Sequence, residues 1–121
     1  MDSPAPLPAM LLPEAADGVE AVAKFFRALG DPARLRLLEF LLGEHTVTEC
    51  VARIGLSQGR VSSHLACLAG CGYVEGRRDG RFTYYKMADP RVAGLVMLAR
   101  SLAADNAEAL AGCVPVTVAA T

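Results

Sequence analysis

The stretch from Ser57 to Gly72, SQGRVSSHLACLAGCG, combines the features of a recognition helix with a pair of cysteines. Ser57 is a residue type favoured at a helix N-cap, and Gly72 stands where a left-handed C-cap residue is expected. Between them, Val61, Leu65 and Leu68 follow the i, i+4, i+7 spacing of one apolar helical face. The pattern therefore predicts a single helix over this stretch.

Polar side chains that can bind DNA occupy the opposite face of the first two turns. Small hydroxyl groups, an amide and an arginine can approach base edges or phosphates without steric exclusion. For the histidine we expect a structural or DNA-facing role, with metal ligation as the alternative. We expect this face to contact DNA through Ser57, Gln58, Arg60, Ser62, Ser63 and His64.

Two cysteines follow at the C-terminal end of the same stretch. Cys67 and Cys71 are four residues apart, so on a helix they share one face with Cβ atoms about 5–6 Å apart. Two thiolates so placed can hold one soft metal ion. The alternative for each cysteine is a small buried hydrophobic residue.

Length and composition indicate one compact domain. The chain has 121 residues, of which 53% are hydrophobic, and its mean hydropathy of +0.33 suggests that some apolar surface lies in a subunit interface. No apolar run approaches the roughly 20 residues that span a bilayer, and the N-terminus lacks the basic segment of a signal peptide. We therefore expect a cytoplasmic protein with no membrane partner. In that reducing compartment, four cysteines favour metal ligands or redox thiols over structural disulfides.

The net charge of −1 hides an uneven distribution along the chain. Residues 1–20 contain four acidic side chains and no basic one. Residues 53–86 contain six basic and two acidic side chains, which gives this part a net charge of +4. A local basic region of this kind is typical of a DNA-binding surface.

Prolines set the N-terminal boundary of the domain. Residues 1–13 contain four prolines among small residues, so we expect a disordered N-terminal arm. Residues 14–111 are expected to form the DNA-binding and dimerisation domain, followed by a C-terminal tail over residues 112–121. Apolar spacing over residues 14–29 predicts the first helix of this domain.

Two further helices are expected before Ser57. Asp31-Pro32 is a favoured helix start, and Gly43 is expected to end this helix. Its apolar positions predict a largely buried element: Leu35, Leu38, Phe40, Leu41 and Leu42. Residues 46–49, TVTE, have the form of a capping box and predict a short helix to about Arg53. A turn over residues 54–56 then completes a helix-turn-helix motif.

A β-hairpin is expected directly after Gly72. Residues 73–78 and 81–87 are rich in aromatic and β-branched side chains and flank Asp79-Gly80, a strong hairpin signal. A hairpin here would be the wing of a winged helix, and we expect DNA contacts from the arginines near its tip, Arg77, Arg78 and Arg81. A solvated hairpin without DNA contacts is the alternative.

Asp89-Pro90 is expected to begin a last helix that extends to about Leu110. Its apolar stripe suggests pairing with the first helix of a second copy: Val92, Leu95, Val96, Leu98, Ala99 and Leu102. The predicted fold is mainly α with a small β-hairpin, in the order α-α-α-α-β-β-α. It is a winged helix-turn-helix that forms a homodimer.

Three motifs together resemble the ArsR/SmtB family of metal-responsive winged-helix repressors. They are Asp31-Pro32-Ala33-Arg34-Leu35-Arg36-Leu37-Leu38, Val61-Ser62-Ser63-His64-Leu65 and Gly72-Tyr73-Val74. The resemblance covers roughly residues 25–102, and the combination of motifs is specific. It implies a dimer that binds double-stranded operator DNA.

Within this family, the stretch from His64 to Gly72 is similar to the CmtR-like branch, which senses cadmium and lead. The resemblance implies a three-thiolate site made of Cys67, Cys71 and Cys113. In that branch the third cysteine comes from the other protomer. Beyond Cys113-Val114 the tail differs from the branch.

Two other metal sites of the family are incomplete in this chain. The Cys-Val-Cys core of the arsenic- and cadmium-type site is Cys50-Val51-Ala52 here, and we expect Cys50 to be buried. The zinc-type site on the last helix needs histidines, but His45 and His64 lie elsewhere. Three thiolates without histidine or carboxylate suit Cd(II), Pb(II), Hg(II) or As(III) better than Zn(II) or Ni(II).

These features predict a repressor that binds operator DNA without metal and is released by a soft metal ion. Cd(II) and Pb(II) are favoured, with Hg(II) and As(III) as alternatives. A second possibility is a thiol redox switch on the same scaffold, in which Cys67 or Cys71 oxidises toward Cys113. We expect no enzyme, because the chain has no Cys-x-x-Cys motif and no phosphate-binding loop.

Overall fold

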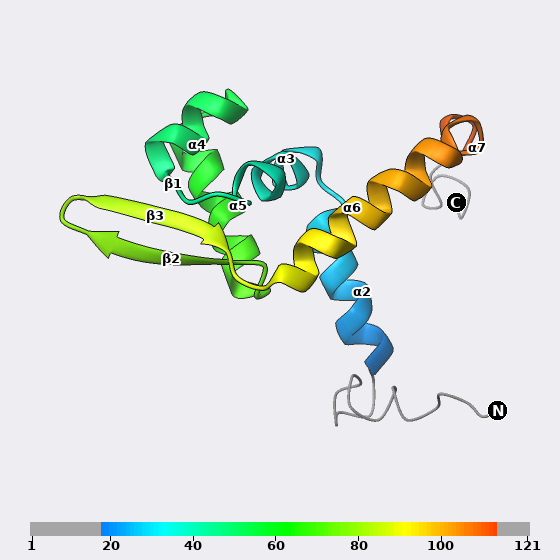
Figure 1. Ribbon diagram of the computed structural model, residues 1–121, viewed down its shortest axis with the longest axis horizontal. Helices are drawn as coiled ribbons and strands as arrows, with labels where there is room; N and C mark the ends of the chain where they lie inside the picture. Colours follow the sequence, from blue (N-terminus) through cyan, green and yellow to red (C-terminus); the bar gives the residue numbers. More distant parts are fainter. Residues whose placement is uncertain (1–17, 114–121) are drawn as a thin grey trace.

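The computed structural model describes residues 18–113, which form a winged helix-turn-helix (Figure 1). This confirms the predicted fold class. The elements, in chain order, are α2 (Gly18–Leu29), α3 (Pro32–Phe40), β1 (His45–Thr46), α4 (Val47–Ile54), α5 (Gln58–Gly70), β2 (Val74–Asp79), β3 (Phe82–Met87), α6 (Pro90–Asp105) and α7 (Ala107–Ala111).

The helix starts follow the capping residues seen in the sequence. Asp31, Ser57 and Asp89 each accept hydrogen bonds from backbone N–H groups of the first turn that follows. The capping box of α4 is complete, because Thr46 Oγ1 accepts from the Glu49 N–H at 3.1 Å and the Glu49 carboxylate accepts from the Thr46 N–H at 2.9 Å. These starts are local properties of the chain and were all predicted correctly.

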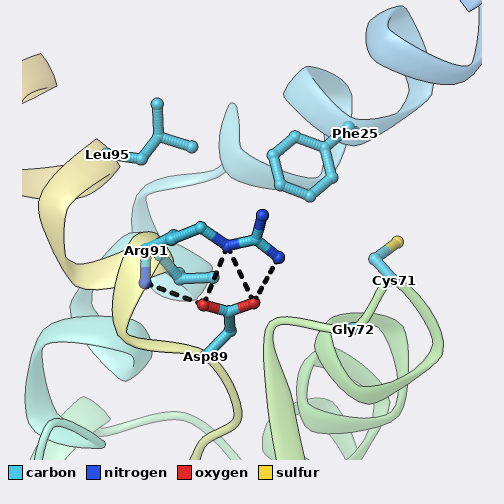
Figure 2. A pocket seen from close by; sticks show the side chains of 7 residues that line it. Phe25, Cys71, Gly72, Asp89, Arg91 and Leu95 are labelled. Carbon is cyan, nitrogen blue, oxygen red and sulfur yellow. Dashed lines mark hydrogen bonds and ion pairs between the residues drawn. The ribbon is translucent and has the colours of Figure 1, made fainter. Parts of the chain in front are cut away.

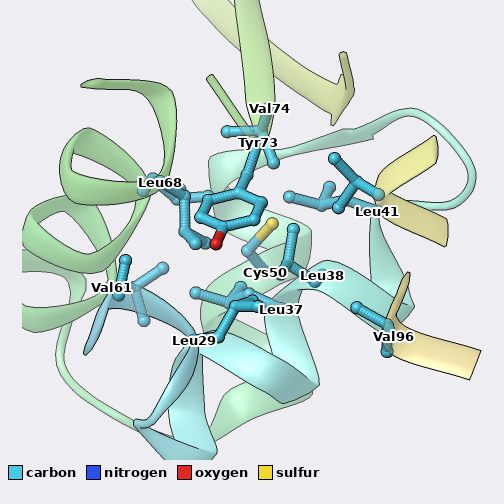
Figure 3. Close-up of a cluster of buried hydrophobic side chains, with 13 residues drawn as sticks. Leu29, Leu37, Leu38, Leu41, Cys50, Val61, Leu68, Tyr73, Val74 and Val96 are labelled. Carbon is cyan, nitrogen blue, oxygen red and sulfur yellow. The ribbon is translucent and has the colours of Figure 1, made fainter. Parts of the chain in front are cut away.

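The hydrophobic core lies where α3, α4, α5 and the start of the hairpin meet (Figure 3). The predicted face of α5 is buried there. Leu42 was expected in this core but is 59% exposed, because α3 ends at Phe40 and the chain turns before Gly43. The largest fully buried side chains are Tyr73, Leu37, Leu38, Leu41, Leu65, Leu68, Val61 and Cys50.

The hairpin joins a third strand that the sequence did not reveal. The sheet order is β1-β3-β2, with His45 of β1 opposite Tyr85 of β3. Asp79 pairs with Phe82, so the connection consists of Gly80 and Arg81 rather than the expected Asp79-Gly80. Gly80 has φ +64°, a value that glycine adopts without strain at the first central position of a two-residue turn.

The last helix is shorter than predicted and is followed by a separate turn of helix. α6 ends at Asp105, and α7 begins at Ala107. At Asn106 the backbone leaves helical geometry, and the Asn106 side chain donates to the Leu102 carbonyl at 2.8 Å. In Figure 1, α6 and α7 extend from the body of the domain away from the hairpin.

Apolar side chains remain exposed on α2 and α6. Phe26 on α2 is 54% exposed and Met97 on α6 is 66% exposed. Only the early part of α6 is buried, through Val92 and Val96. Other exposed apolar residues on these two helices are Val19, Val22, Leu98 and Leu102.

Three expectations lie partly or wholly outside the described residues. The predicted N-terminal arm, residues 1–13, is among them, as are residues 14–17 of the first predicted helix and residues 114–121 of the tail. Within residues 18–113, no helix is long and apolar enough to cross a membrane.

Candidate DNA-binding surface and thiol pair

The N-terminal half of α5 exposes the polar face that the sequence predicted. Val61 and Leu65 point into the core, so the residues between them face outward. The Ser57 hydroxyl is engaged as the helix cap and accepts from the Arg60 N–H at 3.2 Å. All of Ser57, Gln58, Arg60, Ser62 and Ser63 are exposed.

A groove of about 310 Å³ separates the wing from α4 and α5. Gln58 and Ser62 of α5 line one side, and Arg78 and Arg81 of the hairpin line the other. The structure thus brings four of the predicted DNA-binding residues around one hollow. The remaining lining residues are Thr46, Val47, Thr48, Phe82, Thr83 and Tyr85.

The arginines of the wing have different surroundings. Arg77 is held by Glu44, with Arg77 Nε and Nη2 donating to its two carboxylate oxygens at 3.1 and 3.0 Å. Its guanidinium also lies 4.6 Å from the ring centre of Tyr84. Arg78 is the next residue in the strand and therefore points to the opposite face, where it lines the groove.

The Arg77–Glu44 pair changes the acid-base properties of both groups. The side-chain hydrogen bond from Arg77 holds the pKa of Glu44 below its usual range. The same bond raises the pKa of the Arg77 guanidinium. Arg77 is thus already engaged within the protein, whereas Arg78 has a single long hydrogen bond, to Thr83 at 3.4 Å.

His64 is tied to the helix that precedes the helix-turn-helix. Arg34 Nη1 lies 3.3 Å from His64 Nδ1, and because arginine can only donate, the histidine nitrogen is the acceptor. Arg34 Nε also donates to the Ala28 carbonyl at 2.6 Å. His64 is half-buried, and these contacts give it a structural role in holding α5 against the end of α2.

Sequence reasoning missed two hydroxyl groups of the groove, Thr48 and Thr83. Thr48 lies in the first turn of α4, and its position between the capping-box residues Thr46 and Glu49 could have marked it as facing DNA. Thr83 faces the groove because it pairs with Arg78 across the hairpin. That register depends on the turn, which the sequence placed one residue too early.

Cys67 and Cys71 stand at the C-terminal end of α5. Cys67 lies in the last turn, and Cys71 is the C-cap, whose N–H donates to the Cys67 carbonyl at 3.1 Å. Gly72 follows with φ +84°, and the Tyr73 N–H donates to the Leu68 carbonyl at 2.9 Å, the pattern of a Schellman motif. Both thiols are half-buried against the core, as their shared helical face predicts.

A cavity of about 600 Å³ opens beside Cys71 (Figure 2). Phe25 of α2 and Leu95 of α6 form its apolar walls. Arg91 extends into it and pairs with Asp89 at 2.7 Å, which holds the pKa of Asp89 below its usual range. The C-terminal end of α5 is therefore next to both α2 and the start of α6.

Cys50, on α4, has a different environment. Its side chain is fully buried in the core. Burial raises the pKa of the Cys50 thiol to about 11, and the charge of the nearby Glu49 adds to the effect. A thiol of this kind stays protonated near neutral pH, so the structure supports a packing role for Cys50.

Cys113 lies far from the thiol pair of its own chain. α6 starts at the cavity beside Cys71, and its 16 residues span about 24 Å before α7 and Cys113 follow (Figure 1). Within residues 18–113 of one chain, no group of three His, Cys, Asp or Glu side chains could hold a metal ion. The pair and Cys113 of the same chain therefore form no three-thiolate cluster in the described structure.

Comparisons with known proteins identify relatives of the chain. Residues 31–76 match the family model described as bacterial regulatory protein, arsR family. The chain is 62% identical over 95 residues to a protein of Streptomyces lividans named probable mercury resistance operon repressor, and the match covers 78% of this chain and 76% of that protein. It is 43% identical over 74 residues to the regulator CmtR of Mycobacterium tuberculosis, covering 60% of this chain and 63% of CmtR.

A solved structure supports the same relationship. The homodimeric winged helix-turn-helix DNA-binding domain of a possible ArsR-family regulator from Mycobacterium bovis matches with a TM-score of 0.68 at 31% identity. The match covers 78% of this chain and 89% of that domain. The fold and the sequence motifs thus point to one family of transcriptional regulators.

Proposed function

Because the chain belongs to the ArsR family of bacterial transcriptional repressors, we propose that it binds operator DNA as a metal-free homodimer and is released by a soft metal ion. The proposed ligands are Cys67 and Cys71 of one protomer and Cys113 of a second copy. The proposed DNA contacts are the exposed polar face of α5 and the groove beside the wing. This function rests on one arrangement. The thiol pair lies at the C-terminal end of α5, and the polar face lies at the N-terminal end of the same helix.

The residues at the pair fit a thiophilic metal. Both thiols are half-buried, share one helical face and have no histidine or carboxylate with them in a three-ligand cluster within residues 18–113. Thiolate ligands favour soft ions such as Cd(II), Pb(II), Hg(II) and As(III). The name of the Streptomyces lividans relative supports Hg(II), and the resemblance to the CmtR branch supports Cd(II) or Pb(II).

A homodimer accounts for the exposed apolar residues of α2 and α6. Exposed patches of this kind on a small domain mark interfaces, and the related domain from Mycobacterium bovis is a homodimer. Two recognition helices related by two-fold symmetry require half-sites about 34–36 Å apart. The dimer also explains how Cys113, distant from the pair of its own chain, could reach the pair of its partner.

The regulatory effect follows from the position of the two thiols on α5. A bound soft metal ion would supply strong bonds to deprotonated thiols. Cys67 and Cys71 would fix the end of α5 relative to the C-terminal segment of the second copy. The N-terminal half of the same helix faces DNA, so reorienting the helix alters its fit to the operator. A coupling free energy of about 1–3 kcal/mol between the two sites suffices to change DNA occupancy.

The test measures operator affinity by fluorescence anisotropy, using duplex DNA selected for binding from a random library. Cd(II), Pb(II), Hg(II) and arsenite are titrated separately, with a reductant present. We expect at least one to lower DNA affinity and to produce a near-ultraviolet charge-transfer band. Peroxide without metal tests the redox alternative, and a response to peroxide but to no metal would favour it.

Cysteine variants assign the ligands. Cys67→Ser and Cys71→Ser should each abolish the band and leave a protein that binds DNA but ignores metal, because a serine hydroxyl is a harder and far less acidic ligand. Cys113→Ser should weaken the response. Cys50→Ala is the control and should change it least. A response that survives in Cys67→Ser but is lost in Cys50→Ala would move the site to α4.

A further inference from the structure

Tyr73 occupies the point where the thiol-bearing end of α5 meets two other helices. It follows Cys71 and Gly72 directly, and its side chain is fully buried at the centre of the core (Figure 3). A buried hydroxyl group needs a hydrogen-bond partner, and the one found here lies on a different helix. Tyr73 Oη donates to the Phe25 carbonyl of α2 at 2.7 Å.

Three hydrogen bonds connect Tyr73 to three parts of the fold. Its N–H donates to the Leu68 carbonyl of α5 at 2.9 Å, and its own carbonyl accepts from the Ala88 N–H, just before α6, at 3.0 Å. The bond to Phe25 joins it to α2. The Tyr73 ring also lies against the Phe25 ring, with centroids 4.4 Å apart.

The thiol pair lies close to this residue. Cys67 and Cys71 both pack against the core cluster that contains Tyr73. Cys71 is also only two residues before Tyr73, so a short backbone segment and the shared core connect this thiol to Tyr73.

We propose that Tyr73 is a positioning residue that couples the Cys67–Cys71 end of α5 to α2, through its hydroxyl bond to the Phe25 carbonyl, and to the segment just before α6, through its carbonyl bond to the Ala88 N–H. The inference rests on the proposed metal response. It adds the route by which metal binding at α5 would affect α2 and α6, the two helices with exposed apolar faces. Asp89 and Arg91, the other polar groups beside Cys71, pair only with each other in the described structure. Tyr73 has bonds to α5, to α2 and to the residue just before the cap of α6.

Tyr73→Phe tests this by removing the hydroxyl and keeping the ring. Tyr84→Phe is the matched control, because Tyr84 lies on β3 away from the pair and its ring faces Arg77. For each protein, DNA affinity is measured with and without Cd(II), or with Hg(II) if wild type responds only to that ion. Metal binding is followed by the charge-transfer band.

We expect Tyr73→Phe to keep the band at the wild-type stoichiometry and to bind DNA without metal about as well as wild type. The ratio of DNA affinities without and with metal should fall about two- to tenfold, the size of effect expected from one lost hydrogen bond. Tyr84→Phe should keep the wild-type ratio. A merely structural role would lower stability and leave the ratio unchanged, and that result would overturn the inference.

A second readout uses wild-type protein and so does not depend on the folding of a variant. Metal addition should change the hydrogen-exchange protection of the Tyr73 and Ala88 amides and of α2, and unchanged protection there would also overturn the inference. If wild type responds to no metal at all, the proposed function fails instead. The chain has no tryptophan and three tyrosines, so a metal-dependent change in tyrosine emission that is lost in Tyr73→Phe but kept in Tyr84→Phe would further support the coupling.

Discussion

The two ends of α5 are built in opposite ways. At the N-terminal end the outward side chains are polar and exposed, and the Ser57 side chain bonds within the helix itself, as its N-cap. At the C-terminal end the chain is bound to its surroundings by Leu68, the thiol pair and Tyr73, which contact the core, α2 and the approach to α6. One end is therefore available to a ligand, and the other is connected to the rest of the domain.

This difference shows how one helix can carry two functions without interference. Side chains at the exposed end can change DNA contacts with little effect on packing. Changes at the connected end alter packing first and affect DNA only through the orientation of the helix. Mutations at the two ends should accordingly separate into effects on binding and effects on stability.

The largest expected effect is on stability, from replacing a buried side chain at the C-terminal end of α5. Leu68 is fully buried, so Leu68→Ala should lower the free energy of unfolding by about 2–5 kcal/mol through lost burial and a cavity. Ser63, exposed near the other end, should change stability by less than about 0.5 kcal/mol when replaced by alanine. Urea denaturation measures both. If Leu68→Ala and Ser63→Ala destabilise the protein equally, the two ends of α5 do not differ in how they are packed.

The buried thiol of α4 gives the next effect, in the pH dependence of stability. The pKa of Cys50 is raised from 9.0 to about 11, so between these values the folded chain keeps a proton that the unfolded chain loses. The stabilisation is complete below about pH 9 and is lost as pH rises through about 11, a change of about 3 kcal/mol.

Comparison with Cys50→Ala isolates this contribution. Tyrosines and lysines titrate in both proteins, so only the difference between the two stability curves reports on Cys50. The variant should lose less stability than wild type between pH 8 and 11, measured by urea denaturation. Parallel curves would show that the Cys50 thiol titrates as it does in the unfolded chain.

The wing provides a smaller effect, on DNA binding alone. Arg78 lines the groove opposite the exposed end of α5, so Arg78→Ala should weaken DNA binding about tenfold near 0.1 M salt and reduce the salt slope by about 0.9. Arg77 is engaged by Glu44, so Arg77→Ala should leave the slope closer to wild type. Anisotropy titrations at several salt concentrations measure both slopes. A larger loss of slope in Arg77→Ala would mean that Arg77 leaves Glu44 to bind phosphate.

The smallest effect concerns Ser57, the N-cap at the exposed end of α5. Ser57→Ala removes the acceptor of the Arg60 N–H and should cost about 1 kcal/mol of stability. Ser57→Asp, which retains an acceptor, should restore stability, as thermal melts would show. Ser57→Asp should still weaken DNA binding, because a carboxylate repels phosphate. Rescue of both properties would place Ser57 away from the DNA.

Features that depend on neighbouring residues were predictable from the sequence. The starts of α3, α4, α5 and α6 follow from capping residues, and the buried face of α5 follows from its apolar spacing. The family resemblance was confirmed by the arsR model and by the relatives. For the helix starts and the buried face of α5, the physical cause lies within a few residues of the element.

Features that depend on distant partners were missed. β1 has only two residues and exists because it pairs with Tyr84 and Tyr85, about 40 positions later. The exposure of Leu42 depends on where α3 ends, and the opposite directions of Arg77 and Arg78 depend on the hairpin register. The break at Asn106 has neither glycine nor proline to announce it. The complete metal site stays a prediction, because its third proposed ligand belongs to another chain.

The length of α6 turns a small rotation into a large displacement. The helix begins at the cavity beside Cys71 and has only Val92 and Val96 buried, both in its first two turns. With 16 residues it extends about 24 Å, so a tilt of about 5° at its start would move its far end by about 2 Å. An angular change too small to disturb the core would thus become a shift of more than an atomic radius at the far end. The gain is one of leverage, set by the length of the helix beyond its start.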